Sequence, residues 1–210
     1  MKRQLLIPAL LLLFLPFAQG KVKLPAMMGD HMVLQQNSSV KLWGRADGKK
    51  VTITTSWNNR TYRTSTDKDG NWLVKVDTPA GGYTPYSITI NDGTPVTLSD
   101  ILIGEVWICS GQSNMEMRMM GNSAQPVDNS LETILNAGNY RDRIRFITVP
   151  RIKDIQKRTD FEGKKWEVSS PETTIDCSAT GYFFAKQLTQ SLNLPVGLVI
   201  NSWGGSAIEA

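Results

Sequence analysis

The chain has 210 residues, of which 40% are hydrophobic and 20% charged, and its formal net charge is +4. A chain of this length can bury a core and form one large domain or two smaller ones. Without Lys2 and Arg3 the net charge falls to +2, and the remaining basic residues are dispersed, so nucleic acid is not an expected partner. One histidine and two cysteines leave little from which to build a metal site, and no cofactor is expected.

The first twenty residues have the pattern of a secretory signal peptide. Lys2 and Arg3 precede an apolar run from Leu5 to Phe17, which ends at small or polar residues. This run is shorter than the roughly 20 residues that a membrane span needs. We therefore expect a secreted or periplasmic protein with no stable membrane insertion after cleavage. The alternative is a buried N-terminal helix.

Residues 21–100 are predicted to form a β-rich, sandwich-like domain. Short segments from 39 to 99 alternate apolar and polar residues at the period of two that places side chains on one face of a sheet. Turn-forming pairs at Asp69-Gly70, Gly81-Gly82 and Asp92-Gly93 separate them. Trp72 alternates with valines, which favours a core position, and we expect the same of Trp43.

From residue 101 to 210 the pattern changes to that of an α/β domain, because strand-like runs now alternate with helical ones. The expected strands are 101–109, 145–149 and 196–200, and the expected helices are 131–136 and 178–191. Residues 150–177 lack periodicity and are predicted to form a long loop. The basic stretch 151–158 is interrupted by aspartates and indicates a solvated face.

The two cysteines, Cys109 and Cys177, would lie in an oxidising compartment if the signal peptide is real. A single disulfide is therefore possible. However, Cys109 lies in an apolar strand-like run, where a buried free thiol is the commoner state.

Ser113 is the first candidate for chemistry, because it follows a buried strand through Ser110-Gly111-Gln112. Ligands of open α/β sheets bind outside the carboxyl ends of the strands. If a helix begins after Ser113, the free N–H groups at its start would favour developing negative charge. The alternative is that Ser113 only caps that helix, because the G-x-S-x-G pattern of a nucleophile elbow is not present.

Gly204-Gly205-Ser206 is the second candidate, again directly after a buried strand. Two consecutive glycines can direct backbone N–H groups into a cleft, as an oxyanion hole requires. The alternative is a strand-to-helix turn in which Ser206 caps the helix.

Together these segments resemble the sialate O-acetylesterase family of the SGNH-hydrolase superfamily. The resemblance rests on two specific blocks, WICSGQSNM at 107–115 and NSWGGSAIEA at 201–210, in which Ser206 replaces the usual threonine. Two supporting segments are MVLQQ at 32–36 and SATGYFFA at 178–185. The likeness therefore runs from about residue 25 to the last residue.

The resemblance implies an α/β SGNH-hydrolase fold, flavodoxin-like with a parallel sheet between helices, after the β-rich domain. It implies Ser113 as the nucleophile that attacks an acetyl ester on a sugar. The oxyanion donors would be the Ser113 N–H and a glycine N–H from Gly205 or Gly204, with the Gln112 side chain as a further candidate. A lost oxyanion donor typically costs about 3–4 kcal/mol of transition-state stabilisation.

The family's general base and its orienting partner come from an Asp-x-x-His block that this sequence does not contain. The single histidine, His31, precedes the β-rich domain in a segment where the family needs no base, and we expect a surface histidine there. The region from 101 also offers three strands where an SGNH sheet usually has five. We therefore expect the N-terminal part of a longer esterase, without its catalytic His and Asp.

Three functions fit the sequence. The first is a serine-dependent carbohydrate esterase that acts on 9-O-acetylated sialic acid. The second keeps the chemistry but acts on acetylated xylan or another polysaccharide, because related esterases share the Gly-Gln-Ser-Asn pattern. The third is a non-catalytic sugar-binding remnant that uses Trp43, Trp57 or Trp72 of the β-rich domain as stacking platforms.

Overall fold

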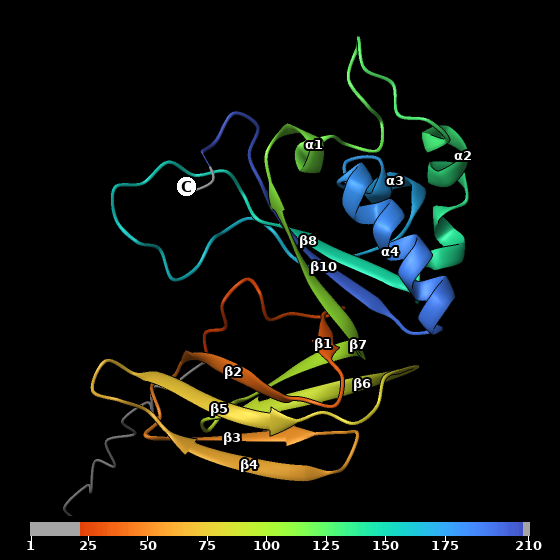
Figure 1. Cartoon of the computed structure of the whole chain (residues 1–210). Coiled ribbons are helices and arrows are strands. Elements are labelled where there is room, and N and C mark those ends of the chain that lie inside the picture. Colours follow the sequence, from red (N-terminus) through yellow and green to blue (C-terminus); the bar gives the residue numbers. More distant parts are fainter. Residues whose placement is uncertain (1–21, 208–210) are drawn as a thin grey trace, which may run out of the picture.

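The structure is a computed structural model that describes residues 22–207. The predicted signal peptide, residues 1–20, lies outside the described residues. The β-rich part and the α/β part form the lower and upper halves of Figure 1. The strands are β1 (Val33–Gln35), β2 (Ser39–Arg45), β3 (Lys50–Thr55), β4 (Arg60–Ser65), β5 (Asn71–Asp77), β6 (Gly82–Asn91), β7 (Pro95–Gly111), β8 (Ile144–Thr148), β9 (Glu167–Val168) and β10 (Val196–Ser202). The helices are α1 (Ser113–Glu116), α2 (Ser130–Leu135), the 3-10 helix Ala137–Tyr140, α3 (Pro171–Thr174) and α4 (Ala179–Leu192).

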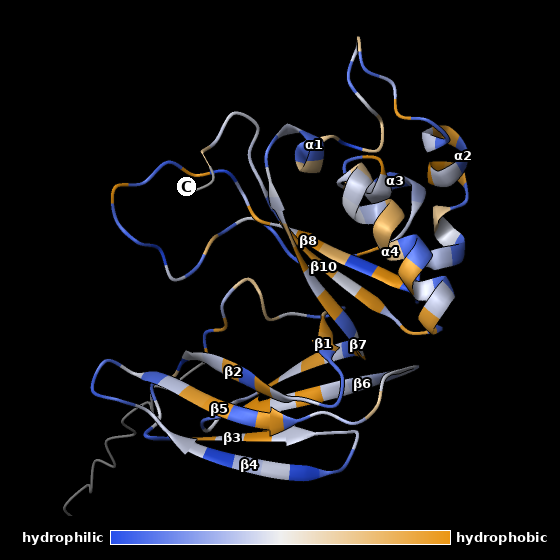
Figure 2. Ribbon diagram, in the orientation of Figure 1, coloured by the Kyte–Doolittle hydropathy of each residue, from blue (hydrophilic) through white to orange (hydrophobic). Residues whose placement is uncertain are grey.

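In the β-rich part, antiparallel strands run in the order β4-β3-β6-β7, and β2 and β5 form a separate antiparallel pair. The apolar side chains of both sheets enter one core. Hydrophobic and hydrophilic residues alternate along these strands in Figure 2. Val51, Ile53, Ile88 and Ile90 come from the larger sheet and Leu42, Trp72 and Val76 from the pair. Trp72 is 3% exposed, as its alternation with valines predicts.

Strand β7 connects the two parts without a break. Its first half pairs antiparallel with β6, and its second half, from Glu105 to Gly111, pairs parallel with β10. In between, β1 adds to β7 in parallel at residues 102–104. The sequence predicts a strand that begins at Ile101, but the strand begins at Pro95 and passes through residue 100, where the sequence pattern changes.

Asp100 is the point at which β7 is irregular. Leu98 pairs with Ile88 and Ile101 with Tyr86, so β7 has one more residue than β6 over this interval. Asp100 has φ of 55°, a left-handed conformation that aspartate tolerates better than most residues. An extra residue of this kind bends a strand and increases its twist. Here it lies between the segment paired with β6 and the segment paired with β10.

A charged network holds this bend. Arg145 of β8 is 1% exposed; it donates a 2.9 Å hydrogen bond to the Asp100 carboxylate and a second hydrogen bond to the Asp100 carbonyl. His31 Nδ1 lies 2.6 Å from the other Asp100 oxygen. Burying an arginine costs several kcal/mol unless a counter-charge and hydrogen bonds compensate. The Asp100 carboxylate therefore joins β8 of the α/β part to the segment before β1.

The parallel sheet has the order β7-β10-β8, with β9 antiparallel to β8 at its edge. One face packs against α4 through Phe146, Leu198 and Tyr182. On the other face, Ile147 and Val199 join the core of the β-rich part. A Cβ at Gly197 would lie 2.7 Å from Val33 Cβ, so glycine is needed for this close approach. β8 and the first five residues of β10 are covered on both faces. The same expectation for residues 101–109 holds only in part, because Trp107 and Ile108 of β7 are exposed.

The expected loop at 150–177 is only partly irregular, so that prediction is wrong for its second half. Residues 167–168 form β9, and 171–174 form α3. Ser170 accepts a hydrogen bond from the Thr173 N–H in a capping box, and Pro171 occupies the first turn. Ser-Pro followed by threonine is a helix-start signal that periodicity does not detect in a single helical turn.

Both cysteines are buried free thiols in the core beneath α4, so the structure contains no Cys109–Cys177 disulfide. Burial raises the pKa of both thiols above the ordinary value, most strongly for Cys177. Within residues 22–207 no helix has the length and apolar character to cross a membrane. The same residues contain no cluster of three or more His, Cys, Asp or Glu that could hold a metal ion.

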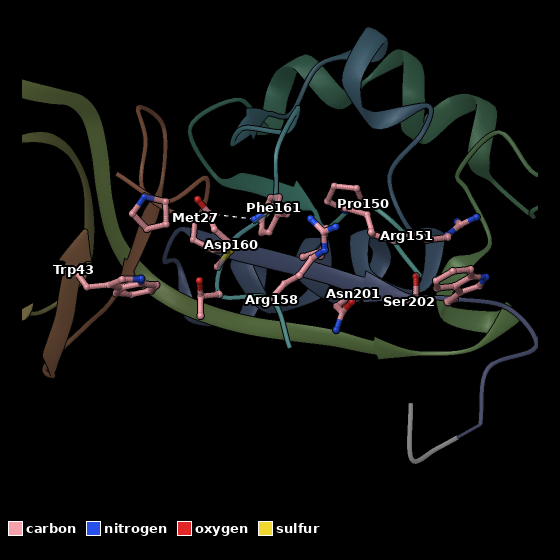
Figure 3. A pocket seen from close by; sticks show the side chains of 14 residues that line it. Met27, Trp43, Pro150, Arg151, Arg158, Asp160, Phe161, Asn201 and Ser202 are labelled. Atoms are coloured by element: carbon pink, nitrogen blue, oxygen red, sulfur yellow. Dashed lines mark hydrogen bonds between the residues drawn. The ribbon is translucent and has the colours of Figure 1, made fainter. Parts of the chain in front are cut away.

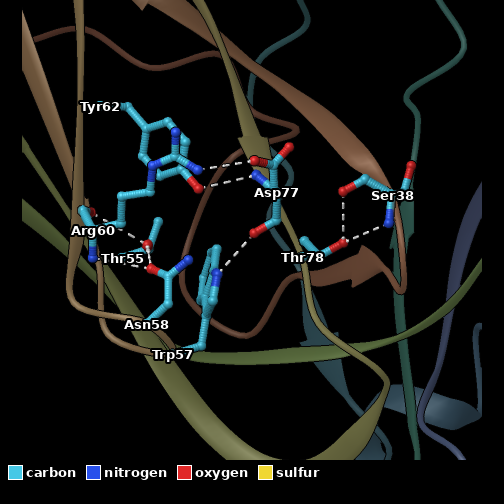
Figure 4. Close-up of polar contacts among 8 residues, drawn as sticks. All are labelled: Ser38, Thr55, Trp57, Asn58, Arg60, Tyr62, Asp77 and Thr78. Atoms are coloured by element: carbon cyan, nitrogen blue, oxygen red, sulfur yellow. Dashed lines mark hydrogen bonds and ion pairs between the residues drawn. The ribbon is translucent and has the colours of Figure 1, made fainter.

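We predict that Asp100→Asn lowers the free energy of unfolding by about 2–3 kcal/mol, because Arg145 then stays buried without its counter-charge. Asparagine tolerates the same backbone conformation, so the substitution tests the charge and not the bend. The measurement is chemical denaturation. The matched control is Asp77→Asn, which removes an exposed ion pair with Arg60 (Figure 4) and should cost less than about 1 kcal/mol. Equal losses in the two variants would contradict the prediction.

The same carboxylate predicts how stability depends on pH. Burial alone would raise the pKa of Asp100, but hydrogen bonds from His31 and Arg145 outweigh it and hold the pKa below the ordinary 3.8. A carboxyl group whose pKa is lower in the folded than in the unfolded state stabilises the folded state. Its contribution is complete at pH values above the unfolded pKa. This contribution should therefore be lost as the pH falls below about 3.8 and through the folded pKa. As the pH is lowered over this range, the free energy of unfolding should fall more steeply for the unmodified protein than for Asp100→Asn. An equal dependence on pH in the two proteins would contradict the assignment.

Candidate functional site

Ser113 lies where the parallel strand β7 ends and helix α1 begins. Gly111 has φ of 146°, a conformation that favours glycine, and lets the chain turn out of the strand. Gln112 is the N-cap residue of α1, and no side chain caps this end of the helix. Ser113 is the first helical residue and is exposed. The interpretation of Ser113 as a helix cap is therefore wrong, because the cap position falls one residue earlier.

The start of α4 fixes α1 in place. Ser178, the N-cap of α4, donates a hydrogen bond to the Met115 carbonyl, and Thr180 donates one to the Asn114 carbonyl at 2.8 Å. The Ala179 N–H donates to the Met117 carbonyl at 2.7 Å. A helix of four residues has few internal hydrogen bonds, so these contacts satisfy its carbonyl groups. The segment 178–185 thus positions the helix that carries Ser113.

The two sequence blocks meet at the carboxyl ends of β7 and β10. The Trp203 N–H donates to the Gly111 carbonyl at 3.0 Å and extends the pairing of the two strands by one bond. A Cβ built on Gly204 would lie 3.7 Å from Ser113 Cα. The glycine block therefore lies directly beside the serine, as the expected edge of a parallel sheet requires.

Glu116 is the central polar contact of this site. Its carboxylate accepts a hydrogen bond from the Gly204 N–H and forms an ion pair with Arg151 at 2.5 Å. A side chain at position 204 would displace this carboxylate. One side chain therefore holds together α1, the segment after β10 and the segment after β8.

The predicted oxyanion donors differ in whether they are available. The Gly204 N–H is engaged by Glu116, and the Gln112 side chain donates to the Ser206 carbonyl. Gly205 has φ of 77°, which favours glycine, and a Cβ there would meet no atom within 4 Å. The Ser113 N–H lies in the first turn of α1, where N–H groups have no intrahelical acceptor. Ser113 and Gly205 thus remain the accessible pair, and their catalytic role stays a prediction.

Ser206 is hydrogen-bonded within its own segment. Its hydroxyl donates a 2.7 Å hydrogen bond to the Trp203 carbonyl, and its N–H donates to the same oxygen at 3.2 Å. Residues 208–210, where a helix capped by Ser206 would continue, lie outside the described residues.

Two hollows flank the serine. One, of about 370 Å³, is lined by Ser113, Glu116, Met117, Arg118, Asn122, Gln125 and Arg151. The other, of about 460 Å³, lies between the two blocks and is lined by Ser110, Gly111, Gln112, Asn201, Ser202, Trp203, Ser206 and Ala207. Both volumes fall in the range of small-molecule pockets. Ser113 itself lines the first hollow, and the second adjoins it through Gly111 and Gln112.

His31 lies far from Ser113. It is bonded to Asp100, and Gly111 lies eleven positions further along β7, which corresponds to roughly 35 Å of extended strand. The expectation of a surface histidine is only partly right, because the side chain is 39% exposed and belongs to the Arg145 network. A general base must reach the proton that it accepts, so His31 does not serve Ser113.

Sequence reasoning did not identify Glu116 or Arg151 as site residues. Glu116 lies three residues after Ser113, and this spacing places both on one side of a helix, which was a usable signal. Arg151 lies in a stretch that the sequence predicts to be a solvated face. It is exposed on that face, yet its guanidinium reaches Glu116, and only the folded chain shows this contact.

The sequence is similar to curated proteins over most of its length. It is 30% identical over 197 residues to sialate O-acetylesterase from Rattus norvegicus, covering 86% of this chain and 35% of the relative. With sialate O-acetylesterase from Homo sapiens it shares 29% identity over 202 residues, covering 87% of this chain and 37% of the relative. This chain is a relative of the sialate O-acetylesterases. It spans about a third of their length.

A solved structure supports the same relationship. The crystal structure of a carbohydrate acetylesterase from Xanthomonas citri matches with a TM-score of 0.81 and 30% identity, covering 90% of this chain and 42% of that chain. The relationship therefore extends to the fold of both parts. No protein-family model matches the sequence.

We predict that Glu116→Ala lowers the free energy of unfolding by roughly 1–3 kcal/mol, because the Gly204 N–H and Arg151 both lose their partner. Glu116→Gln should cost less, since its amide oxygen can still accept from Gly204. The control is Glu132→Ala, an exposed carboxylate on α2, which should change stability by less than about 0.5 kcal/mol. Denaturant unfolding of the three variants provides the test, and a loss at Glu116 no larger than that at Glu132 would contradict the role given to Glu116.

Proposed function

We propose that this chain is the nucleophile-bearing part of a serine-dependent carbohydrate O-acetylesterase that acts on O-acetylated sialic acid. The observation that carries the proposal is the exposed Ser113 at the carboxyl end of β7 beside Gly204-Gly205, in a chain related to enzymes named for this activity. Such a site can attack an ester and hold the resulting negative charge.

In the proposed reaction, Ser113 Oγ attacks the acetyl carbonyl and its proton passes to a general base. The carbonyl oxygen becomes an oxyanion, held by the N–H groups of Ser113 and Gly205. The tetrahedral intermediate collapses, the sugar hydroxyl leaves with a proton, and an acetyl group remains on Ser113. Water then attacks this acyl-enzyme and releases acetate.

Glu116 has a positioning role in this proposal. Its bond to the Gly204 N–H removes that donor from the oxyanion hole and fixes the peptide that leads to Gly205. The ion pair with Arg151 orients the carboxylate. A preorganised donor is worth more than a mobile one, because no reorganisation is needed as charge develops.

We further propose that the general base lies on chain that follows Ala210. Among residues 22–207, the single histidine is bonded to Asp100, and the carboxylate nearest Ser113 along α1 is engaged by Gly204 and Arg151. The β7 segment that pairs with β10 has no strand on its other edge among the described residues, and Trp107 and Ile108 there are 43% and 73% exposed. An exposed apolar edge of this kind favours completion of the sheet by further strands.

Export belongs to the same proposal. Residues 1–20 have the signal-peptide pattern, and an acetylated glycan substrate is accessible outside the cytoplasm or in the periplasm. N-terminal sequencing of the mature protein should find the first residue near Lys21; an intact Met1 would contradict export by this route.

The decisive experiment is acetyl release from 9-O-acetylated sialic acid by the product of the complete reading frame. Ser113→Ala should lower the rate by roughly 1,000-fold or more, because the acyl-enzyme cannot form. Ser191→Ala, an exposed serine at the end of α4, is the matched control and should leave the rate unchanged. Release that survives Ser113→Ala would identify a different nucleophile.

Sequencing of the gene past the codon for Ala210 tests the proposed source of the base. We expect an open frame with an Asp-x-x-His block. A stop codon directly after Ala210, together with an inactive product, would instead support a non-catalytic remnant.

A further inference from the structure

Three hollows on one side of the molecule adjoin one another. The first is the 460 Å³ hollow between the two sequence blocks. The second, of about 390 Å³, shares Asn201, Ser202 and Trp203 with the first and continues to Trp43 of the β-rich part. The third, of about 660 Å³, shares Pro25, Trp43, Thr159 and Asp160 with the second. We call these three hollows the trough. It leads from the edge of the sheet that carries Ser113 to the two-stranded β2-β5 sheet.

Figure 3 shows how the middle of the trough is built. Trp43 and Ser202 lie at its opposite ends, and Arg158, Asp160 and Phe161 lie between them. The residues come from β2, from the segment after β8 and from the end of β10. The segment 150–161 therefore forms a wall that connects the two parts of the chain, and it is not only the solvated face that its charge predicts.

Trp43 lies on the exposed face of β2, between the exposed Lys41 and Arg45. In β2 it alternates with the buried Leu42, so its side chain points away from the core, and it is 38% exposed. The expectation that Trp43 is a core residue is therefore wrong, because it lies in the opposite phase of the pleat from Leu42. Trp43 pairs across the two strands with Leu73, which is also exposed, and both line the far hollow. An apolar surface that is contiguous and lies in a groove marks a binding site more often than a single exposed side chain does.

The other tryptophans considered as stacking platforms are occupied. Trp72 is buried in the core. Trp57 packs edge-on against Tyr86 with ring centroids 5.9 Å apart, and its indole N–H donates to the Asp77 carbonyl at 2.9 Å (Figure 4). Trp72 also lines the far hollow, but Trp43 is the member of the three that lines both the middle and the far hollow.

The lining has the chemistry of a sugar-binding groove. The C–H faces of pyranose rings pack on flat aromatic surfaces, which Trp43 provides. Trp203 also lines the middle hollow, and Lys153 Nζ lies 5.9 Å from the centroid of its ring. Ring hydroxyls need hydrogen-bond partners, and Asn201, Asp160 and Arg158 present such groups along it. Three adjoining hollows of this size hold several rings, whereas one acetylated sugar fills only the hollow next to Ser113.

We propose that the trough binds an oligosaccharide chain of three or more pyranose rings, with Trp43 as the stacking platform farthest from Ser113. The inference rests on the proposed function in one respect, the orientation of the bound glycan. The esterase proposal places the acetylated ring at the Ser113 end of the trough. The preferred substrate is accordingly an acetyl group on a glycan chain and not on a free monosaccharide. Trp43 contacts the glycan and takes no part in the chemical step.

Binding of deacetylated glycans to the complete protein tests the trough without requiring hydrolysis. Isothermal titration would compare xylose with xylotetraose, and sialic acid with a sialylated tetrasaccharide, so that the two arms distinguish neutral from acidic chains. At least one tetrasaccharide should bind roughly tenfold more tightly than its monosaccharide. Trp43→Ala should remove most of that difference.

Trp57→Ala is the matched control. Trp57 also lies in the β-rich part, but it packs on Tyr86 and lines none of the three hollows. It should retain the preference for the longer glycan. Equal affinity for monosaccharide and tetrasaccharide in both arms, no binding at all, or an equal loss in the two tryptophan variants would overturn the proposal.

The binding test of the trough and the activity test of the proposed esterase can succeed or fail independently. A chain-length preference lost only in Trp43→Ala, combined with acetyl release that survives Ser113→Ala, would retain the trough and reject the nucleophile. Serine-dependent release without any chain-length preference would retain the esterase and reject the trough.

Discussion

The structure depends on strand β7 being shared by two sheets. Its first half is an antiparallel partner of β6 and its second half a parallel partner of β10. Because a strand is rigid along its hydrogen-bonded length, the orientation of the α/β part follows from the bend at Asp100. The buried Arg145 fixes that bend through the Asp100 carboxylate. The direction in which β7 presents Ser113 is therefore set at Asp100, 13 residues before the serine.

The site is held together by several contacts, each of which is individually weak. Helix α1 has four residues and is held by α4 through Ser178 and Thr180. The glycine block is held by Glu116 and by the pairing of Trp203 with Gly111. Such an arrangement keeps a serine exposed while fixing its backbone, which is the condition for an oxyanion hole built from N–H groups. It also explains why Gly204, although next to the serine, is not the available donor.

Two consequences connect the fold to carbohydrate chemistry. The β-rich part covers one face of the parallel sheet, so its surface continues into the edge where the serine lies. An exposed tryptophan on β2 and the polar wall from 150 to 161 thus lie along a path from that edge. Under the proposed glycan binding, the β-rich part contacts the end of the substrate that lies farthest from Ser113.

The sequence by itself determined the elements and the motifs. Period-two alternation located the β strands, continuous apolar runs located β7, β8 and β10, and the GQSN and WGG blocks located the candidate site, because these signals are local. Short elements such as α3 escaped periodicity because one turn contains too few residues to show it. Only the tertiary structure decided that Trp43 faces outward, that Glu116 engages Gly204 and Arg151, and that His31 is bonded to Asp100. The contacts of Glu116 and His31 join residues that lie 35 to 88 positions apart in the sequence. The orientation of Trp43 is a choice between the two faces of a strand. Both depend on how the strands pair, which local sequence signals do not specify.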